Sequence, residues 1–207
     1  MDAATRGLRL EEVEAAAALL GRAFLDDPGA MIVEPDPALR ESAGRLLFAP
    51  VVRQAIPFGR VLAAVSVEGE LLGVATFLPP GHSTATDDEM VAAGLLDAVA
   101  RVPAAADRMG PMVADLEELH ARAIDGPHAR LEFFGVEPAA QGTGIGSRLI
   151  AAGHATIDAN RERCYLETFT TKNVEFYEKR GYRVAAEGLV RRTDTPVWGP
   201  VREPQPV

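Results

Sequence analysis

The sequence has little of what marks disulfide-bonded, membrane or nucleic-acid-binding proteins. Its single cysteine, Cys164, excludes an internal disulfide, so nothing argues against a reducing cytoplasm. No apolar run approaches the roughly 18 residues that span a membrane, and the first residues lack the apolar core of a signal peptide. Lysine and arginine form no basic run that would indicate nucleic-acid binding. We therefore expect a cytoplasmic protein that binds neither membrane nor nucleic acid.

The four histidines, His82, His120, His128 and His154, do not have the spacing of a metal site. His120 and His128 flank a Gly-Pro loop, where we expect two solvent-facing side chains. Local spacing also assembles no Ser-His-Asp or Cys-His nucleophile set. The sequence therefore predicts no bound metal and agrees with chemistry that forms no covalent bond to the protein.

The composition is that of one globular domain. The chain has 207 residues, of which 47% are hydrophobic and 25% are charged, enough for one well-filled core. The net charge of -9 is first of all a solubility trait, although it would also attract a cationic amine. We expect a single domain over residues 1–207.

Hydrophobic periodicity and turn residues predict an alternation of helices and strands. The clearest hairpin joins Val61–Val67 to Leu71–Leu78, and two helical stretches, 87–100 and 104–124, then precede the next strand. The other expected strands are Thr5–Leu10, His128–Val136, Cys164–Thr168, Tyr182–Val190 and Pro196–Val201. The other expected helices are Glu11–Leu25, Pro37–Ile56, 144–161 and 174–180, the last with Asn173 as its N-cap.

A glycine-rich turn joins the strand at His128–Val136 to the helix that follows it. Gly142, Gly144 and Gly146 let the backbone turn sharply and keep side chains away from its amides. Because these amides open a helix, they are unpaired donors at the positive end of its dipole. The pattern predicts a phosphate or pyrophosphate site.

Two other phosphate-binding patterns fit this turn poorly. A dinucleotide fingerprint needs a third glycine where Ser147 stands, and only about 65 residues follow, too few for the rest of a parallel sheet. A P-loop needs a lysine, and the turn has none.

The turn closely resembles the acyl-CoA-binding motif of the GNAT acetyltransferase superfamily, Val-x-Pro-x-x-Gln/Arg-x-x-Gly-x-Gly/Ala-x-x-Leu. The places of this motif are filled by Val136, Pro138, Gln141, Gly144, Gly146 and Leu149. A second match follows one strand later, where Asn173, the pair Phe176-Tyr177, Gly181 and Tyr182 occur in the family's order. The strings Leu166-Glu-Thr and Val197-Trp198-Gly-Pro resemble a narrower subgroup, that of puromycin N-acetyltransferase.

The resemblance implies an α/β (α+β) fold with a mixed, mostly antiparallel sheet of six to seven strands flanked by helices. It also marks residues 79–127 as a helical insertion between strands 3 and 4. The implied activity is direct transfer of an acetyl group from acetyl-CoA, bound as a co-substrate, to a primary amine of a small molecule. A protein or peptide amine and a non-catalytic acyl-CoA-binding module are the alternatives. Monomer and homodimer both stay open.

The resemblance also assigns residues to the site. The residues implied in acetyl-CoA binding are Phe134, Val136, Gln141, Gly142, Thr143, Gly144, Ile145, Gly146, Ser147, Asn173, Phe176 and Tyr177. A backbone amide near Val136 is expected to stabilise the oxyanion, and Tyr177 to stabilise or protonate the departing thiolate. Glu132 is our candidate base for the amine, because a regular strand would place it on the face of Phe134 and Val136. Glu167 and ordered water are the alternatives.

Overall fold

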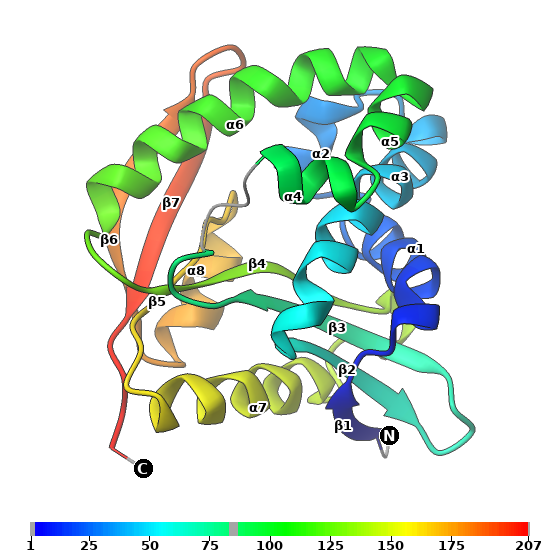
Figure 1. Ribbon diagram of the computed structural model, residues 1–207. Coiled ribbons are helices and arrows are strands. Elements are labelled where there is room, and N and C mark those ends of the chain that lie inside the picture. The colour runs from blue at the N-terminus through cyan, green and yellow to red at the C-terminus, as the bar shows by residue number, and fades with distance from the viewer. Residues whose placement is uncertain (1–2, 83–86, 207) are drawn as a thin grey trace.

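The computed structural model describes residues 3–82 and 87–206 of the chain. Within this part, one sheet of seven strands has the order β1-β2-β3-β4-β5-β7-β6. All neighbouring pairs are antiparallel except β4 and β5, which are parallel. Helices cover the sheet (Figure 1). The predicted fold class is confirmed.

The strands are short to medium in length. They are β1 (Ala3–Gly7), β2 (Val61–Ser66), β3 (Leu71–Leu78), β4 (Ala129–Val136), β5 (Cys164–Tyr165), β6 (Tyr182–Val190) and β7 (Thr195–Arg202). The α-helices are α1 (Val13–Ala23), α2 (Pro28–Val33), α3 (Pro37–Ala55), α4 (Asp87–Ala92), α5 (Leu95–Arg101), α6 (Pro103–Ala123), α7 (Ile145–Ala159) and α8 (Thr171–Glu178). Short 3-10 turns occupy Leu10–Glu12, Ile56–Phe58 and Pro138–Ala140. No helix in these ranges is both long and apolar enough to cross a membrane.

Two hydrophobic clusters lie on opposite faces of the sheet. One joins α7 and α8 to β3, β4 and β5, and the other joins α1 and α3 to β2 and β3. Successive β4 residues show this division, since Phe133 packs with the α1 cluster and Phe134 with the α7 cluster. Burial on both faces explains why β2 and β3 read as nearly continuous apolar runs.

The segment between β3 and β4 is helical, as predicted for residues 79–127, of which 83–86 lie outside the described residues. Its longest helix, α6, crosses the β6–β7 hairpin (Figure 1). One predicted helix, 87–100, is divided into α4 and α5 by Gly94, which has a left-handed φ of 96°. Another helix, α2, was not predicted, because Asp27-Pro28-Gly29 reads as a stop. Asp27 instead caps α2 by accepting from the Gly29 N–H at 2.8 Å, and Pro28 occupies its first turn.

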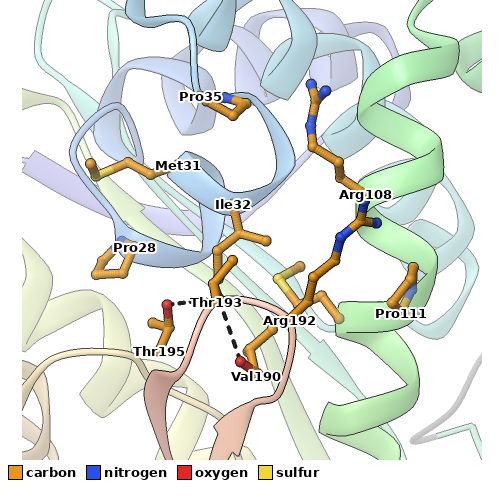
Figure 2. Close-up of a pocket in the computed structure, with 11 residues that line it drawn as sticks. Pro28, Met31, Ile32, Pro35, Arg108, Pro111, Val190, Arg192, Thr193 and Thr195 are labelled. Carbon is orange, nitrogen blue, oxygen red and sulfur yellow. Dashed lines mark hydrogen bonds between the residues drawn. The ribbon is translucent and has the colours of Figure 1, made fainter.

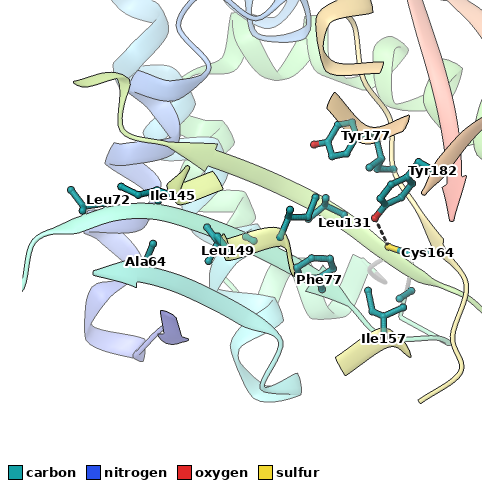
Figure 3. Close-up of a cluster of buried hydrophobic side chains, with 14 of the residues drawn as sticks. Ala64, Leu72, Phe77, Leu131, Ile145, Leu149, Ile157, Cys164, Tyr177 and Tyr182 are labelled. Carbon is teal, nitrogen blue, oxygen red and sulfur yellow. Dashed lines mark hydrogen bonds between the residues drawn. The ribbon is translucent and has the colours of Figure 1, made fainter. Parts of the chain in front are cut away.

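The contact between α7 and β3 depends on a missing side chain. Leu149 and Ile157 pack into the core from α7, and Phe77 from β3 lies between them (Figure 3). Gly153 faces the Phe77 ring so closely that a Cβ there would overlap it. The glycine thus sets how near α7 comes to the sheet.

We therefore expect Gly153→Ala to destabilise the protein by about 1–3 kcal/mol, because the added methyl must displace the Phe77 ring. Gly110→Ala on α6 is the matched control, since no atom lies within 4 Å of its Cβ position. In a helix interior that change adds up to about 1 kcal/mol of stability. Urea unfolding measures both values, and equal effects at the two positions would contradict the packing role of Gly153.

Candidate active site

The neighbouring strands β4 and β5 separate almost as soon as they pair. Their only paired residues are Ala129 with Cys164 and Arg130 with Tyr165. Beyond Arg130, β4 continues to Val136 alongside β3, and within the described residues no strand pairs with its other edge. The two strands therefore splay apart beyond Arg130.

The backbone of the free β4 edge offers hydrogen-bond donors to this opening. Glu137 N–H donates to Leu72 O on the β3 side at 2.9 Å. Antiparallel pairing alternates, so at the register Val136 opposite Gly73 the N–H and C=O of Val136 point away from β3. The same alternation turns the N–H of Phe134 toward the opening. Two amides of the strand are thus directed into the splay.

The turn after β4 is held by its own side chains. Gln141 Nε2 donates to Val136 O at 3.1 Å, and Thr143 Oγ1 donates to Ala140 O at 2.7 Å. Gly142 and Gly144 have left-handed φ values of 76° and 84°, which favour glycine. Gly142 has no atom within 4 Å of its Cβ position, so the turn is open on that side.

The third glycine serves packing rather than turning. Gly146 is the second residue of α7 and has no positive φ, so our expectation that three glycines bend the turn holds for only two. A Cβ at Gly146 would lie 3.1 Å from the Phe134 ring and 3.3 Å from Val136. Ile145, the first residue of α7, is buried in the core and fixes the helix start. Gly146 therefore lets α7 lie against the free part of β4.

Two arginines stand beside the N-terminus of α7. Arg180 donates to Ser147 Oγ at 2.6 Å and to Phe176 O at 2.5 Å, and its guanidinium carbon lies 3.5 Å from the centre of the Phe176 ring. The Arg148 guanidinium folds back to 3.4 Å from the Cβ position of Gly144. The two guanidinium groups, the N–H groups of the turn and the positive end of the α7 dipole would together favour binding of an anion here. Arg180 lies between Tyr177 and Gly181 of the second motif, and this position is the sequence signal that could have identified it.

The fit to acetyl-CoA can be judged from these features alone. The pyrophosphate of CoA suits the open turn and its two arginines. The pantetheine arm of CoA carries amides, which suit the N–H groups along the free β4 edge. The stack of Phe134 on Phe176, at 5.7 Å between ring centres, ties β4 to α8 beside the turn. The residues present therefore fit the co-substrate.

Helix α8 begins earlier than predicted. Its N-cap is Thr170, whose Oγ1 accepts from Asn173 N–H at 3.2 Å, so Asn173 lies within the first turn and is not the cap. Threonine is itself a good N-cap residue, and the amide that it binds lies three positions later in the chain.

The Tyr177 side chain lies in the core cluster with only 8% of the residue exposed. Its ring contacts Phe176 and Tyr182 at centroid distances of 5.3 and 5.4 Å. The Tyr182 hydroxyl donates to Cys164 Sγ at 3.3 Å, whereas the Tyr177 hydroxyl points away from both (Figure 3). Burial raises the pKa of Tyr177, and the neighbouring acidic groups of Cys164 and Asp27, which would repel a phenolate, raise it further. Tyr177 thus stays a neutral donor through physiological pH.

Glu132 does not lie where a regular strand would place it. The register with β3 shifts so that Thr76 faces Phe133 and Phe77 faces Leu131, leaving Glu132 as the extra residue of a bulge. The parity on which its expected face depended is therefore broken. Its carboxylate instead contacts Arg130 Nε at 3.1 Å.

Arg130 gathers three carboxylates where β4 and β5 begin to separate. Glu117 from α6 lies at 3.0 Å, Glu132 at 3.1 Å and Glu167 at 2.9 Å from its nitrogens. Although burial opposes its charge, these carboxylates raise the pKa of Arg130. Burial also raises the pKa of Glu167, against the attraction of Arg130. The cluster thus contains three carboxyl groups and a single guanidinium.

The expectation of two solvent-facing histidines is wrong. His120 and His128 are both buried, and their Nε2 atoms are 2.6 Å apart. His128 Nδ1 donates to Gly126 O at 2.7 Å, so in a neutral His128 Nε2 accepts from His120. Burial lowers the pKa of His128, which favours this neutral form. The His120 ring also stacks on Tyr165 at 4.4 Å, and the pair ties α6 to the sheet.

No three His, Cys, Asp or Glu side chains are arranged to hold a metal ion in the part of the chain that the structure describes. A cavity of about 300 Å³ lies between α2, α6 and the turn that joins β6 to β7. Figure 2 shows Ile32 and Pro35 on one wall and Arg108 and Pro111 on another. Because it includes residues of α2 and of the inserted α6, sequence reasoning had no signal that could bring these segments together.

A protein-family model matches the part of the chain that holds this site. Residues 109–184 match the model described as "Acetyltransferase (GNAT) domain". This range contains the free part of β4, the turn, α7 and α8. No curated protein matches in sequence.

Solved structures with the same fold cover nearly the whole chain. One is described as histone acetyltransferase HPA2 and related acetyltransferase from Corynebacterium glutamicum, with 21% identity, coverage of 99% of this chain and 98% of that chain, and a TM-score of 0.65. PaiA N-acetyltransferase from Thermoplasma acidophilum, solved with coenzyme A, has 14% identity, coverage of 98% and 99%, and a TM-score of 0.61. Drosophila melanogaster polyamine N-acetyltransferase has 15% identity, coverage of 98% and 100%, and a TM-score of 0.56.

These similarities give no support to the narrower resemblance to puromycin N-acetyltransferase. Residues 109–184 thus match a GNAT acetyltransferase domain, and this match together with the shared fold supports an acetyl-CoA-dependent acyltransferase.

Proposed function

We propose that this protein transfers the acetyl group of acetyl-CoA directly to a primary amine of a small molecule. The observation that carries the proposal is the free β4 edge, which leads through the short turn Pro138–Ala140 into the open glycine turn. We further propose that residues 1–207 form one domain. The single, buried thiol of Cys164 fits a cytoplasmic setting.

The residues of the turn and the splay have separate roles in this proposal. The amides from Gly142 to Ser147 hold the pyrophosphate, with Arg180 and Arg148 beside them. Phe134 and Val136 supply amides to the arm and to the thioester oxygen, where one amide stabilises the oxyanion. Gln141, Thr143 and Ile145 keep the turn in shape. Asn173 and Phe176 close the α8 side.

Tyr177 acts as a hydrogen-bond donor to the departing thiolate. Proton transfer from a phenol near pKa 10 to a thiolate near 8.5 is uphill by roughly 2 kcal/mol. The raised pKa of Tyr177 increases this cost. A strong hydrogen bond, or transfer concerted with carbon–sulfur cleavage, therefore accounts better for its role than a separate proton transfer.

Glu132 is our candidate for the base that removes the amine proton. Its side chain is 21% exposed, against 9% for that of Glu167, and of its two carboxylate oxygens Oε2 is the one that contacts Arg130 Nε. An alkylamine near pKa 10 arrives mostly as ammonium, which the acidic Arg130 cluster would attract. The proton then passes to Glu132 before or during attack.

The cavity beside α2 and α6 is our candidate for the acceptor pocket. Its volume of about 300 Å³ is at the lower end for small-molecule sites, which favours a small amine over a protein chain. Pro28 on its wall precedes Gly29, whose Cβ position lies 2.7 Å from the ring of Phe169, just ahead of α8. The inserted α6 thus contributes to the proposed acceptor site through Arg108, Pro111 and Met112.

The proposal is tested by following thiol release from acetyl-CoA across amines, with polyamines, aminoglycosides, amino acids, puromycin and short peptides in the panel. We expect release with at least one small amine. Release with peptides alone would replace the small-molecule acceptor by a protein amine. Tight binding of acetyl-CoA without release from any amine would favour a binding module, and no binding would refute the site.

Tyr177→Phe should lower kcat about 100-fold and leave the KM for acetyl-CoA nearly unchanged, because only the developing thiolate loses a donor. Tyr182→Phe is the matched control, since its hydroxyl bonds Cys164 and not the opening. Steady-state kinetics measure both variants. Full turnover by Tyr177→Phe would remove the catalytic role and leave the binding site intact.

Glu132→Gln should lower kcat/KM for an alkylamine at pH 7 by roughly 10²-fold. The deficit should shrink near pH 10, where about half of the amine is already neutral and needs no base. Glu167→Gln is the comparison, because it also removes one carboxylate from Arg130. A pH profile of kcat/KM distinguishes the two, and a loss by Glu132→Gln that is equal at both pH values would exclude a base role.

A further inference from the structure

The walls of the cavity beside α2 are mostly apolar. Pro28, Met31, Ile32 and Pro35 line one side, and Pro111 and Met112 line the side of α6. The β6–β7 turn closes the third side with Thr193 and Thr195, whose hydroxyls are 2.9 Å apart (Figure 2). Such walls suit the apolar part of a ligand, and the β6–β7 turn supplies the hydroxyl groups that could bind its polar part.

Two arginines hold these walls together and are themselves neutralised. Arg108 of α6 donates to Val33 O at 2.7 Å and to Glu34 at 2.9 Å, which fixes α2 against α6. Arg191 of the turn binds Asp115 through its backbone N–H at 2.8 Å and its Nε at 2.6 Å, and binds Glu118 at 2.9 Å. The β6–β7 turn is thus fastened to α6 at Arg191, the residue immediately before Arg192.

That next residue, Arg192, also lines the cavity and extends from the turn toward α6 (Figure 2). Within the described residues it pairs with no acidic side chain, whereas Glu34, Asp115 and Glu118 are engaged by the other two arginines. A guanidinium with unused donors on an apolar wall is suited to a carboxylate or another planar anion.

We propose that the acceptor is an amine that also carries a carboxylate, joined to it through an apolar body that fills the cavity. Arg192 binds the carboxylate, and the hydroxyls of Thr193 and Thr195 complete its recognition. This inference rests on the proposed acetyl transfer and on this cavity as its acceptor pocket. It names the chemical class of the substrate. The net charge of -9 alone would not have favoured a substrate that carries a carboxylate.

The fold also bounds the size of this substrate. Arg108, on the cavity wall, and Glu117, in the Arg130 cluster, are nine positions apart on α6. At 1.5 Å per residue the two levels are separated by about 13 Å along the helix axis. Arg192 follows Arg191, which is bound at Asp115 and Glu118, so along α6 this interval of about 13 Å is an upper limit for the distance between an amine at the acidic cluster and a carboxylate at Arg192.

The test compares alkylamines with ω-amino acids of equal length, such as octylamine with 8-aminooctanoate, and includes the shorter six-carbon pair. We expect the wild type to prefer 8-aminooctanoate over octylamine by about 10- to 100-fold in kcat/KM, the range of one charged hydrogen-bonded contact. Arg192→Met should remove this preference and leave octylamine within about threefold. Arg192→Lys, which keeps the charge, should retain part of it.

Arg183→Met is the matched control, because Arg183 is an exposed arginine on β6 and its loss changes the net charge equally. It should leave the preference intact. Thiol release from octylamine with no preference for the amino acid, or an equal loss of both substrates in Arg192→Met, overturns this inference while acetyl transfer stands. Release from no amine overturns acetyl transfer, and this inference with it.

Discussion

The end of pairing between β4 and β5 is the constraint on which the proposed chemistry depends. Two residue pairs hold the strands together, and everything beyond them is available to a ligand. A sheet edge in the middle of a sheet would normally attract another strand, because unpaired N–H and C=O groups are costly when buried. Here α7 and α8 support the opening from one face. A ligand with its own amides can complete the unpaired edge.

The beginning of the opening is closed by buried charge rather than by apolar packing. Arg130 connects β4 to β5 through Glu167 and to the inserted helix α6 through Glu117. The His120–His128 contact joins α6 to the sheet a second time. Buried ion pairs add little to stability, but their directional bonds fix geometry. The insertion is thereby held in one position relative to the free β4 edge.

Much of this structure follows from local pattern. The hairpin of β2 and β3, the amphipathic α7 and the glycine turn all carry signals within a few residues, and each was predicted near its observed position. The register shift at Glu132 has no such signal, because it arises between strands. The same holds for His120 and His128, whose burial depends on where α6 lies. Asn173 shows a third case, in which two good N-cap residues, Thr170 and Asn173, stand three positions apart.

The placement of Cys164 has a consequence for a protein proposed to generate a free thiol at every turnover. Burial raises the pKa of Cys164 to about 11, although the Tyr182 hydroxyl bound to its sulfur opposes the shift. Thiol–disulfide exchange requires an accessible thiolate, and Cys164 is neither accessible nor ionised near neutrality. It is also the chain's only cysteine. The protein therefore cannot become trapped as a mixed disulfide with oxidised product while it stays folded.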